Sequence, residues 1–407
     1  MKILIVSDVY PPEISSASHL MQELAEGLAQ RGHKINVVTS HPRYYLEENK
    51  KRENLKTFSV ENNVNIIRVK TLPLHKVNFI IRGISQLILP FLFFKKIKTF
   101  IKGKIDVVIV YSPPLPLGFV GSKVKHYYNS KFILNIQDIF PQNAIDLGIL
   151  RNKVLVKFFE LIEKKIYRSA DKIVFHSEGG RDFLIKEKEI PLEKIITIPN
   201  WVDIDFYKNQ KRNALFREKY KLKDKFVFLF AGIFGPAQGL DFLIKVAKEV
   251  SNIKDIVFLL VGGGMEQKKI QERIKRYSLT NVIIKPFVSK EDYPYLLKDV
   301  DVGIVCLNNK NKTPFIPGKF LGYLAGSLPI VAFLNNNSDG FSLIEKAKCG
   351  YAVESNNINE AVKVIKKIYI EKEKLKEFGE NGFHYALNNL TIDICLKKFE
   401  YLFQKNI

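Results

Sequence analysis

Short apolar runs alternate with amphipathic segments along almost the whole chain. In the first half the strand-like runs are KILIVSD, KINVVTS, DVVIVYS, FILNIQD and KIVFHS, and HLMQELAEGLAQRGH between the first two has helical apolar spacing. Near-continuous Val, Ile and Leu strands separated by helices are typical of parallel sheets covered on both faces. The pattern therefore predicts an α/β fold with doubly wound sheets.

The alternation restarts after about Phe206, with FVFLFAG, DIVFLLVGG, NVIIKPF, VDVGIVCL and LPIVAF. A chain of 407 residues is also too long for one ordinary core. We therefore expect two facing Rossmann-like domains over residues 1–203 and 204–388, and a C-terminal helix, 389–407, that could return to the first domain.

Two loops of the first half place polar side chains after strands, where open α/β sheets bind ligands. Ser15 and Ser16 precede the first helix, where serine either approaches a ligand or caps the helix. Gln137 and Asp138 follow the strand FILNI, and a carboxylate there can orient a substrate hydroxyl or accept a proton. A turn or helix cap is the alternative for Asp138.

Glycines mark two strand-to-helix junctions of the second half. Gly232 and Gly239 lie in FAGIFGPAQGLDF, and Gly262 and Gly263 lie in LLVGGG. Glycine lets backbone approach a phosphate closely, although a structural turn explains such glycines as well. The spacing is not the G-x-G-x-x-G of dinucleotide sites.

A third junction, FIPGKFLGYLAGSLPIVAF, adds a cation. Pro317 and Gly318 break the chain, Lys319 begins a helix that Gly326 could end, and LPIVAF is a buried strand. A lysine at a helix start attracts anions. Taken together, these junctions suit a diphosphate bound in an interdomain cleft, where fixed dipoles and a cation stabilise the leaving group without a metal.

Positive charge is concentrated in one part of the chain. The sequence has 64 basic and 42 acidic residues, and residues 51–131 hold 15 Lys and Arg against three acids. Such a block indicates an anionic partner, a membrane or nucleic acid. Nucleic acid is not expected, because no zinc-finger or RRM signature is present.

Within the basic block, an apolar run is followed by lysines. The uncharged stretch Gly83–Phe94 has 12 residues, which is too short to span a bilayer. An apolar face beside lysines suits a helix lying at an anionic membrane surface, and a buried helix with a solvated lysine edge is the alternative. The residues expected to contact membrane or acceptor are Leu87, Phe91, Phe93, Lys95, Lys96 and Lys98.

Other kinds of site have little support in the sequence. The three cysteines form no spaced set, so we expect a reducing, cytoplasmic setting. The start MKILIVSDVY is a strand pattern and not a signal peptide. Two D-x-D stretches, Asp203–Asp205 and Asp299–Asp301, are interpreted as incidental, and no histidine pair has ligand spacing. We therefore expect neither a metal nor another cofactor.

Taken as a set, these motifs resemble glycosyltransferase family 4, which has the GT-B fold, over essentially the whole length. The likeness rests on YPPEISSASHLMQELAEGLAQRGHKINVVT, YSPPLPLGFVG, NIQDIFPQNAIDLGIL, IPNWVDIDFY, AGIFGPAQGLDFLI, LLVGGG and PGKFLGYLAG-SLPIVA. It is strongest to the surface-polysaccharide subgroup that includes fucosamine-type transferases. The resemblance implies sugar transfer with retention from a nucleotide-diphosphate donor, usually without a metal.

The resemblance also implies roles for the two domains. The C-terminal domain would hold the donor and the N-terminal domain the acceptor, often a lipid-linked one. We expect Asp138, Gln137 and Lys319 to act in catalysis. The expected donor contacts are Ser15, Ser16, Gly232, Gln238, Gly239, Gly262, Gly263, Val288, Pro317, Gly318 and Lys319.

The chain departs from the family pattern at several positions, four of them in the C-terminal half. Family members often carry Glu-x7-Glu at the helix of Lys319, and Pro314 and Gly322 stand there instead. The second glutamate usually holds the donor ribose. An arginine and a lysine of the donor domain are replaced by Ile233 and Gln238, which leaves Lys319 as the cation for the phosphates.

The sequence thus predicts a retaining transferase that moves a hexose or N-acetylhexosamine, carried by UDP, to a lipid-linked glycan. It would work in the cytoplasm, peripherally at the inner face of the cell membrane. A non-catalytic glycosyltransferase-like subunit that binds a partner or lipid is the main alternative. A nucleotide-sugar epimerase on two Rossmann-like sheets is a further one.

Overall fold

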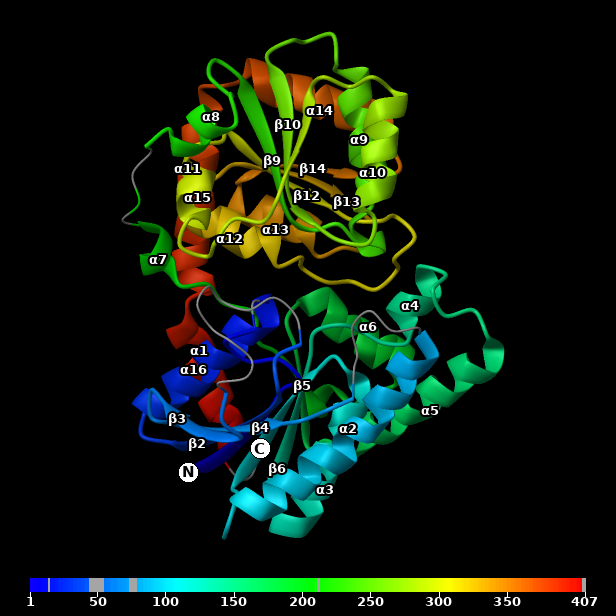
Figure 1. The fold of residues 1–407 in the computed structure, drawn as a ribbon, viewed down its shortest axis with the longest axis vertical. Coiled ribbons are helices and arrows are strands. Elements are labelled where there is room, and N and C mark those ends of the chain that lie inside the picture. Colours follow the sequence, from blue (N-terminus) through cyan, green and yellow to red (C-terminus); the bar gives the residue numbers. More distant parts are fainter. Residues whose placement is uncertain (14, 44–54, 73–78, 209, 211–212, 405–407) are drawn as a thin grey trace. The chain divides into compact units, whose positions relative to one another are not determined.

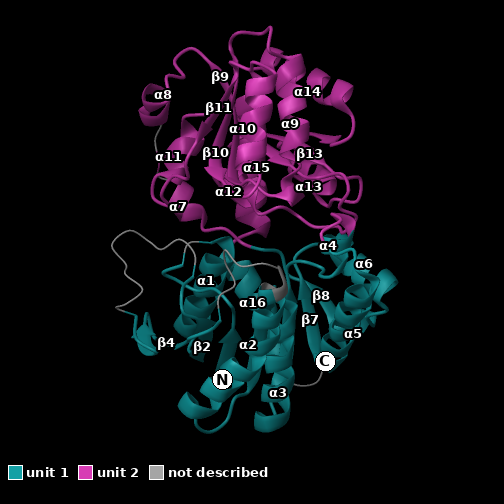
Figure 2. Cartoon of the chain, turned by 45° about the vertical axis from the view of Figure 1, so that its right-hand side comes forward, with its two compact units in different colours: residues 1–145, 150–200, 392–407 teal, residues 146–149, 201–391 magenta. Residues whose placement is uncertain are grey.

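The computed structural model describes residues 1–13, 15–43, 55–72, 79–208, 210 and 213–404. The chain divides into two compact units (Figure 2). Unit 1 comprises residues 1–145, 150–200 and 392–407, and unit 2 comprises residues 146–149 and 201–391. Each unit has its own sheet and its own hydrophobic core, as the restart of the alternation after Phe206 predicted.

In the part of unit 1 that the structure describes, eight strands form one sheet in the order β3-β4-β2-β1-β5-β6-β7-β8. Figure 1 labels β2 to β6 of this sheet. β3 and β4 are antiparallel, and the other neighbours are parallel. The strands are β1 (Lys2–Val6), β2 (Lys34–Ser40), β3 (Phe58–Glu61), β4 (Val64–Val69), β5 (Val107–Ser112), β6 (Lys131–Ile136), β7 (Lys172–Phe175) and β8 (Ile195–Thr197).

Helices cover both faces of this sheet. They are α1 (Ser16–Gln30), α2 (Phe79–Phe100), η2 (Leu115–Leu117), α3 (Gly118–Tyr128), α4 (Gln142–Asp146), α5 (Lys153–Ser169), α6 (Glu178–Lys188), η3 (Leu192–Lys194) and α16 (Ile392–Phe403). Leu4 and Val6 of β1 belong to the core shared with α2, α3, α5 and α6. Ile3 and Ile5 alternate with them and are buried on the opposite face, which α1 and α16 cover.

The last helix, α16, packs on α1. A Cβ added at Gly27 would lie 2.6 Å from Leu396 Cδ1, so glycine permits this close helix contact. Arg31, just past the end of α1, pairs with Asp393 and Glu400 of α16 at 2.8 Å each. These contacts hold the C-terminal helix against unit 1.

The described part of unit 2 has six parallel strands in the order β11-β10-β9-β12-β13-β14. They are β9 (Phe226–Ile233), β10 (Ile256–Gly263), β11 (Val282–Lys285), β12 (Val302–Cys306), β13 (Ile330–Leu334) and β14 (Gly350–Glu354). The helices are α7 (Ile204–Lys208), α8 (Leu215–Lys219), η4 (Pro236–Gln238), α9 (Leu240–Glu249), α10 (Gln267–Arg276), α11 (Tyr293–Lys298), α12 (Lys319–Ala325), α13 (Gly340–Ala347), α14 (Ile358–Ile370) and α15 (Lys374–Asn389).

The strand order of unit 2 fixes where a ligand can bind. From β9 the chain proceeds outward to β10 and β11, and from β12 it proceeds in the opposite direction to β13 and β14. The order therefore reverses between β9 and β12. Ligands of open α/β sheets bind beyond the carboxyl ends of the strands at such a switch point, which here means the loops that follow β9 and β12.

The apolar run of α2 is divided between the core and the surface. Phe93 is fully buried and Leu87 packs against the core, whereas Phe91 is 65% exposed. The prediction that Phe93 contacts the membrane is therefore wrong, because its side chain fills the space between α2 and the sheet. No helix within the described residues is long and apolar enough to cross a membrane.

Candidate donor-binding site

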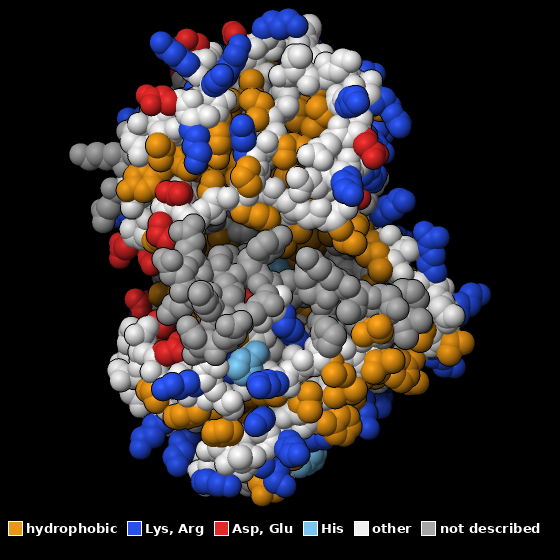
Figure 3. All heavy atoms as spheres, viewed as in Figure 1, with side chains coloured by type: hydrophobic (Ala, Val, Ile, Leu, Met, Phe, Trp, Pro, Cys, Tyr) orange, Lys and Arg blue, Asp and Glu red, His pale blue; other side chains and the backbone are white. Residues whose placement is uncertain are grey.

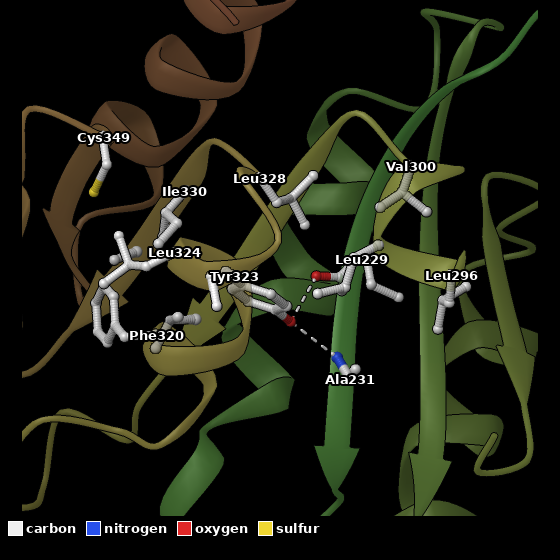
Figure 4. Packing of buried hydrophobic residues seen from close by; sticks show 14 of the residues in the cluster. Leu229, Ala231, Leu296, Val300, Phe320, Tyr323, Leu324, Leu328, Ile330 and Cys349 are labelled. Carbon is white, nitrogen blue, oxygen red and sulfur yellow. Dashed lines mark hydrogen bonds between the residues drawn. The ribbon is translucent and has the colours of Figure 1, made fainter. Parts of the chain in front are cut away.

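Helix α12 is anchored to the sheet of unit 2 by its apolar side. Phe320, Tyr323 and Leu324 are fully buried (Figure 4). The backbone N–H of Ala231 on β9 donates to the Tyr323 hydroxyl at 3.2 Å, and that hydroxyl lies 3.2 Å from the carbonyl oxygen of Leu229, to which it donates. The position of Lys319, the first residue of the helix, is therefore fixed relative to β9.

The ammonium group of Lys319 turns toward the loop after β9. Its Nζ donates to Gln238 Oε1 at 2.5 Å and lies 4.6 Å from the centroid of the Phe230 ring. A Cβ added at Gly232 would lie 3.0 Å from Lys319 Cε, so a glycine leaves room for this side chain. The predicted residues Gly232, Gln238 and Lys319 thus come together at the switch point.

Lys319 is partly buried, and this burial has an electrostatic cost. Desolvation lowers the pKa of its ammonium group to about 8. Burial also raises the pKa of the neighbouring Cys306 thiol to about 12, so that the thiol stays neutral. Among the described residues no carboxylate lies within ion-pair distance of Lys319. An anionic ligand would supply the missing counter-charge.

Gly239 joins the loops that follow β9 and β12. Its φ is +59°, and an added Cβ would lie 2.9 Å from the backbone N and Cα of Asn308. The N–H of Asn308 donates to the carbonyl of Ala237 at 2.8 Å, and its side-chain amide donates to the carbonyl of Pro236 at 2.9 Å. Asn308 was not singled out from the sequence, although it directly follows the buried strand run.

The β10 glycines have a packing explanation. Gly262 has a φ of +148°, and an added Cβ would lie 1.9 Å from the carbonyl oxygen of Gly232. The N–H of Phe234 donates to the Gly263 carbonyl at 2.8 Å. Glycine is thus needed at position 262 because two backbone segments come close together there. This favours the structural explanation of Gly262, which was the alternative to phosphate binding. Val288 is partly buried in the loop after the neighbouring β11.

The two residues before Lys319 differ in exposure. Pro317 is buried, and Gly318 is exposed with no atom within 4 Å of an added Cβ. Gly318 thus leaves open space directly before the first residue of α12.

The candidate residues of the first half lie on unit 1. Ser15 caps α1, since Ser18 N donates to its Oγ at 3.1 Å, and Ser16 is exposed. Gln137 Oε1 accepts a hydrogen bond from Asn200 Nδ2 at 2.6 Å. Asp138 is exposed beyond the carboxyl end of β6.

An ionic cluster at the ends of β1 and β2 was missed in the sequence. Arg43 pairs with Asp8 at 2.5 Å, and Ser40 Oγ donates to Asp8 Oδ1 at 2.6 Å. Glu13 Oε2 accepts from the backbone N–H of Arg43 at 2.8 Å. This cluster lies at the carboxyl edge of the unit 1 sheet, where a substrate of this unit would bind.

Comparison with protein families decides the assignment. The family Glycosyltransferase Family 4 matches residues 17–206, and Glycosyl transferases group 1 matches residues 211–385. The two matches fall on the two halves of the chain. The chain belongs to glycosyltransferase family 4.

Individual relatives of the chain are also glycosyltransferases. The chain is 24% identical to the probable glycosyltransferase WbjE of Pseudomonas aeruginosa over 70% of each chain. It is 24% identical to the putative colanic acid biosynthesis glycosyl transferase WcaI of Escherichia coli, covering 80% of this chain and 81% of WcaI. It is 22% identical to the chitobiosyldiphosphodolichol beta-mannosyltransferase of Candida albicans, over 74% of this chain and 68% of the relative. The protein is a glycosyltransferase of polysaccharide or glycan biosynthesis.

The fold agrees with GT-B. Sucrose-phosphate synthase from Thermosynechococcus elongatus superimposes with a TM-score of 0.77 at 14% identity, over 99% of this chain and 98% of the other. Anabaena HepE in complex with UDP-glucose gives 0.72 at 15% identity, over 99% of each chain.

The family departures have structural counterparts. At Gly322, where the family resemblance leads us to expect glutamate, an added Cβ would lie 3.1 Å from Tyr293 Cε1 and 3.5 Å from the Tyr207 hydroxyl. Two tyrosines therefore occupy the side of α12 on which Gly322 lies. Ile233 is exposed, and Pro314 is partly buried.

The second D-x-D pair serves the fold. Asp299 accepts hydrogen bonds from the backbone N–H groups of Ala214 and Phe216. Asp301 pairs with Arg217 at 2.7 Å. Both carboxylates thus make contacts that hold unit 2 together. No group of three or more His, Cys, Asp or Glu that could hold a metal was found within the described part of the chain.

Proposed function

We propose that this glycosyltransferase transfers a hexose or N-acetylhexosamine, with retention, from a UDP-linked donor to a lipid-linked glycan at the cytoplasmic face of the cell membrane. The observation that carries the proposal is Lys319, a partly buried ammonium group without a carboxylate partner among the described residues, beside Gly232 and Gly239 at the switch point. This arrangement suits a diphosphate.

Two comparisons support the choice of substrates. HepE, a structural neighbour, was solved with UDP-glucose, which favours a UDP-linked donor. The name of the Candida relative specifies a sugar chain on diphosphodolichol, which favours an acceptor carried by a lipid diphosphate. In unit 1, Gln137, Asp138 and the Asp8–Arg43 pair would position the hydroxyls of the acceptor or of the donor sugar.

The proposed reaction breaks the bond between C1 of the donor sugar and the diphosphate oxygen. A hydroxyl oxygen of the acceptor forms the new bond to C1 on the same face, and its proton passes to the departing phosphate. Lys319 would neutralise charge that develops on the diphosphate, and the Gln238 amide and Gly239 backbone would add hydrogen bonds. Because Lys319 supplies a positive charge, we propose that no metal is required.

A transfer assay tests the proposal. Purified protein is incubated with UDP-glucose or UDP-N-acetylglucosamine, a polyprenyl diphosphate glycan and EDTA, and the product is analysed by mass spectrometry and by NMR of the new anomeric centre. Transfer with retention in the presence of EDTA is expected. Inversion, or a strict requirement for a divalent cation, would contradict the proposed mechanism.

One observation supports the non-catalytic alternative. Tyrosine side chains lie beside Gly322, where the family resemblance leads us to expect a carboxylate. Calorimetry separates a transferase from such a subunit. A folded protein that binds none of the UDP-sugars would favour the subunit that binds a partner or lipid. Conversion of UDP-sugar in the absence of acceptor would favour an epimerase.

A further inference from the structure

Helix α5 of unit 1 has an apolar stripe that faces solvent. Val154 is 77% exposed, Phe158 42% and Leu161 60%, and their spacing of four and three residues places them on one side of the helix. Ile162 and Ile166 on another side are buried in the core. The helix thus has a second apolar side that no described part of the chain covers, which is uncommon for a surface helix.

Basic side chains border this stripe. The exposed residues of α5 include Lys153, Lys157, Lys164, Lys165 and Arg168. Of its two acids, Glu163 is buried and paired with Lys188 at 2.9 Å, so Glu160 is the exposed one. An apolar stripe bordered by lysines combines insertion into lipid with attraction to anionic headgroups.

Ring contacts extend this surface from α5 across α3 to α2. Lys165 of α5 lies 5.9 Å from the ring centroid of Phe119 on α3, and Lys123, one helical turn further along α3, lies 3.9 Å from the ring of Phe91 on α2. Figure 3 shows hydrophobic side chains gathered over α2 and α5 with Lys and Arg around them. The docking surface, as we call it, consists of the exposed and partly exposed side chains of α2, α3 and α5, together with Lys102 just past the end of α2.

The part of the docking surface on α2 and α3 is hollowed and basic. A depression of about 550 Å³ is lined by Phe91, Phe94, Lys95, Lys98, Lys102 and Lys123, among others. In sequence, α2, α3 and α5 together contain nine lysines and two arginines against two glutamates. A surface of this charge is complementary to anionic lipid headgroups, whose phosphates the depression can accept.

We propose that the docking surface binds an anionic lipid bilayer, with Val154, Phe158 and Leu161 of α5 inserted among the acyl chains and the lysines of α2 and α3 on the phosphates. The inference builds on the membrane location proposed above and moves the inserting residues from α2, where Phe93 is core, to α5. It requires no transferase activity.

Vesicle binding tests the proposal without nucleotide. The full chain is sedimented with phosphatidylglycerol–phosphatidylcholine vesicles or with phosphatidylcholine alone. We expect at least tenfold tighter binding to the anionic vesicles, and at least a tenfold loss in Val154→Ser/Leu161→Ser. The matched control Leu192→Ser/Ile370→Ser removes two aliphatics that are 65% and 74% exposed elsewhere, and it should bind within twofold of wild type.

A tryptophan reporter tests insertion separately. Trp201, the only tryptophan of the chain, is buried, so Phe158→Trp adds an exposed fluorophore over a low background. Quenching of this fluorophore by brominated acyl chains is expected. Absence of quenching, failure of the wild type to bind anionic vesicles, or unchanged binding of Val154→Ser/Leu161→Ser would overturn the proposal.

Two further measurements separate lipid binding from dimerisation and from donor binding. If Val154→Ser/Leu161→Ser converts a dimer to a monomer in sedimentation velocity, a second copy of the chain covers the stripe and the proposal is wrong. Stabilisation by UDP should be the same in this variant and in wild type. Vesicle binding without any UDP binding would refute the proposed UDP donor and leave the docking surface intact.

Discussion

The ammonium group of Lys319 donates a hydrogen bond to the side-chain oxygen of Gln238, 2.5 Å away. The acceptor is a neutral amide, so the positive charge of Lys319 is not cancelled within this pair. A phosphate oxygen can replace the amide at little cost, because a charged hydrogen bond is stronger than one to a neutral acceptor. The pair therefore keeps Lys319 in position and available for an anion.

Substitution of Lys319 tests its role in the reaction. Lys319→Ala is expected to lower turnover at least tenfold, which corresponds to about 1.4 kcal/mol of barrier. Lys310→Ala, at an exposed lysine of the same connection, is the control and should leave turnover unchanged. If Lys319→Ala is as active as wild type, Lys319 has no part in the mechanism.

The depressed pKa of Lys319 predicts a pH dependence of binding. Lys319 has a pKa of about 8 without ligand, and a bound diphosphate raises it, so binding takes up a proton near pH 8. UDP affinity should fall by up to about tenfold from pH 7 to pH 9. Titration calorimetry in buffers of different ionisation enthalpy measures both effects, and Lys319→Ala should show neither.

The same shift affects the stability of the free protein. The folded-state pKa of about 8 lies below the 10.5 of an ordinary lysine, so the unfolded chain binds more protons between these values. The contribution of Lys319 to the free energy of unfolding is therefore least favourable below pH 8 and rises toward pH 10.5. Comparison of wild type with Lys319→Met across this window isolates it. Equal slopes for the two proteins would contradict the shift.

Gly239 is predicted to be essential for the loop geometry. Gly239→Ala combines a φ of +59° with a Cβ 2.9 Å from the Asn308 backbone, and should lower the free energy of unfolding by about 2 kcal/mol or more. Gly318→Ala is the matched control, with a φ of −59° and open space at its Cβ, and should change stability by less than about 0.5 kcal/mol. Equal urea-denaturation midpoints for the two variants would show that the loop adapts.

The substitution Gly322→Glu tests whether the glutamate expected from the family resemblance can be accommodated at this position. The site is buried, and the added Cβ would lie 3.1 Å from Tyr293, so the variant should lose about 2 kcal/mol or more of stability. UDP affinity should not increase. Tighter UDP binding with undiminished stability would mean that the ribose reaches this side of α12.

The fold and the meeting of the loops around Lys319 could be predicted because their determinants are local in sequence. Continuous apolar strands specify parallel sheets, and the glycines with Lys319 sit at fixed distances from the strand ends. The Asp8–Arg43 pair could not be predicted this way. Its members are 35 positions apart, and they meet because β1 and β2 are neighbours in the sheet.

The two helices for which we propose membrane contact show a second limit of sequence patterns. Both α2 and α5 contain apolar positions beside lysines, and the pattern does not say which apolar side faces the sheet. In α2 the phenylalanine at 93 is buried, while in α5 the one at 158 is exposed. Tertiary packing decides between these outcomes, and the neighbours that α2 and α5 meet are remote in sequence.

The most direct measurement is thermal unfolding of the wild-type protein with UDP, UMP and uridine at pH 7. A ligand that binds only the folded state raises stability by about 2.7 kcal/mol at a hundredfold excess over its Kd. A site built for a diphosphate predicts a clear rise in Tm with UDP, a smaller one with UMP and none with uridine, and Lys319→Ala should lose most of the UDP effect. Equal shifts with UDP and uridine, or no shift with any of them, would contradict a diphosphate site at Lys319.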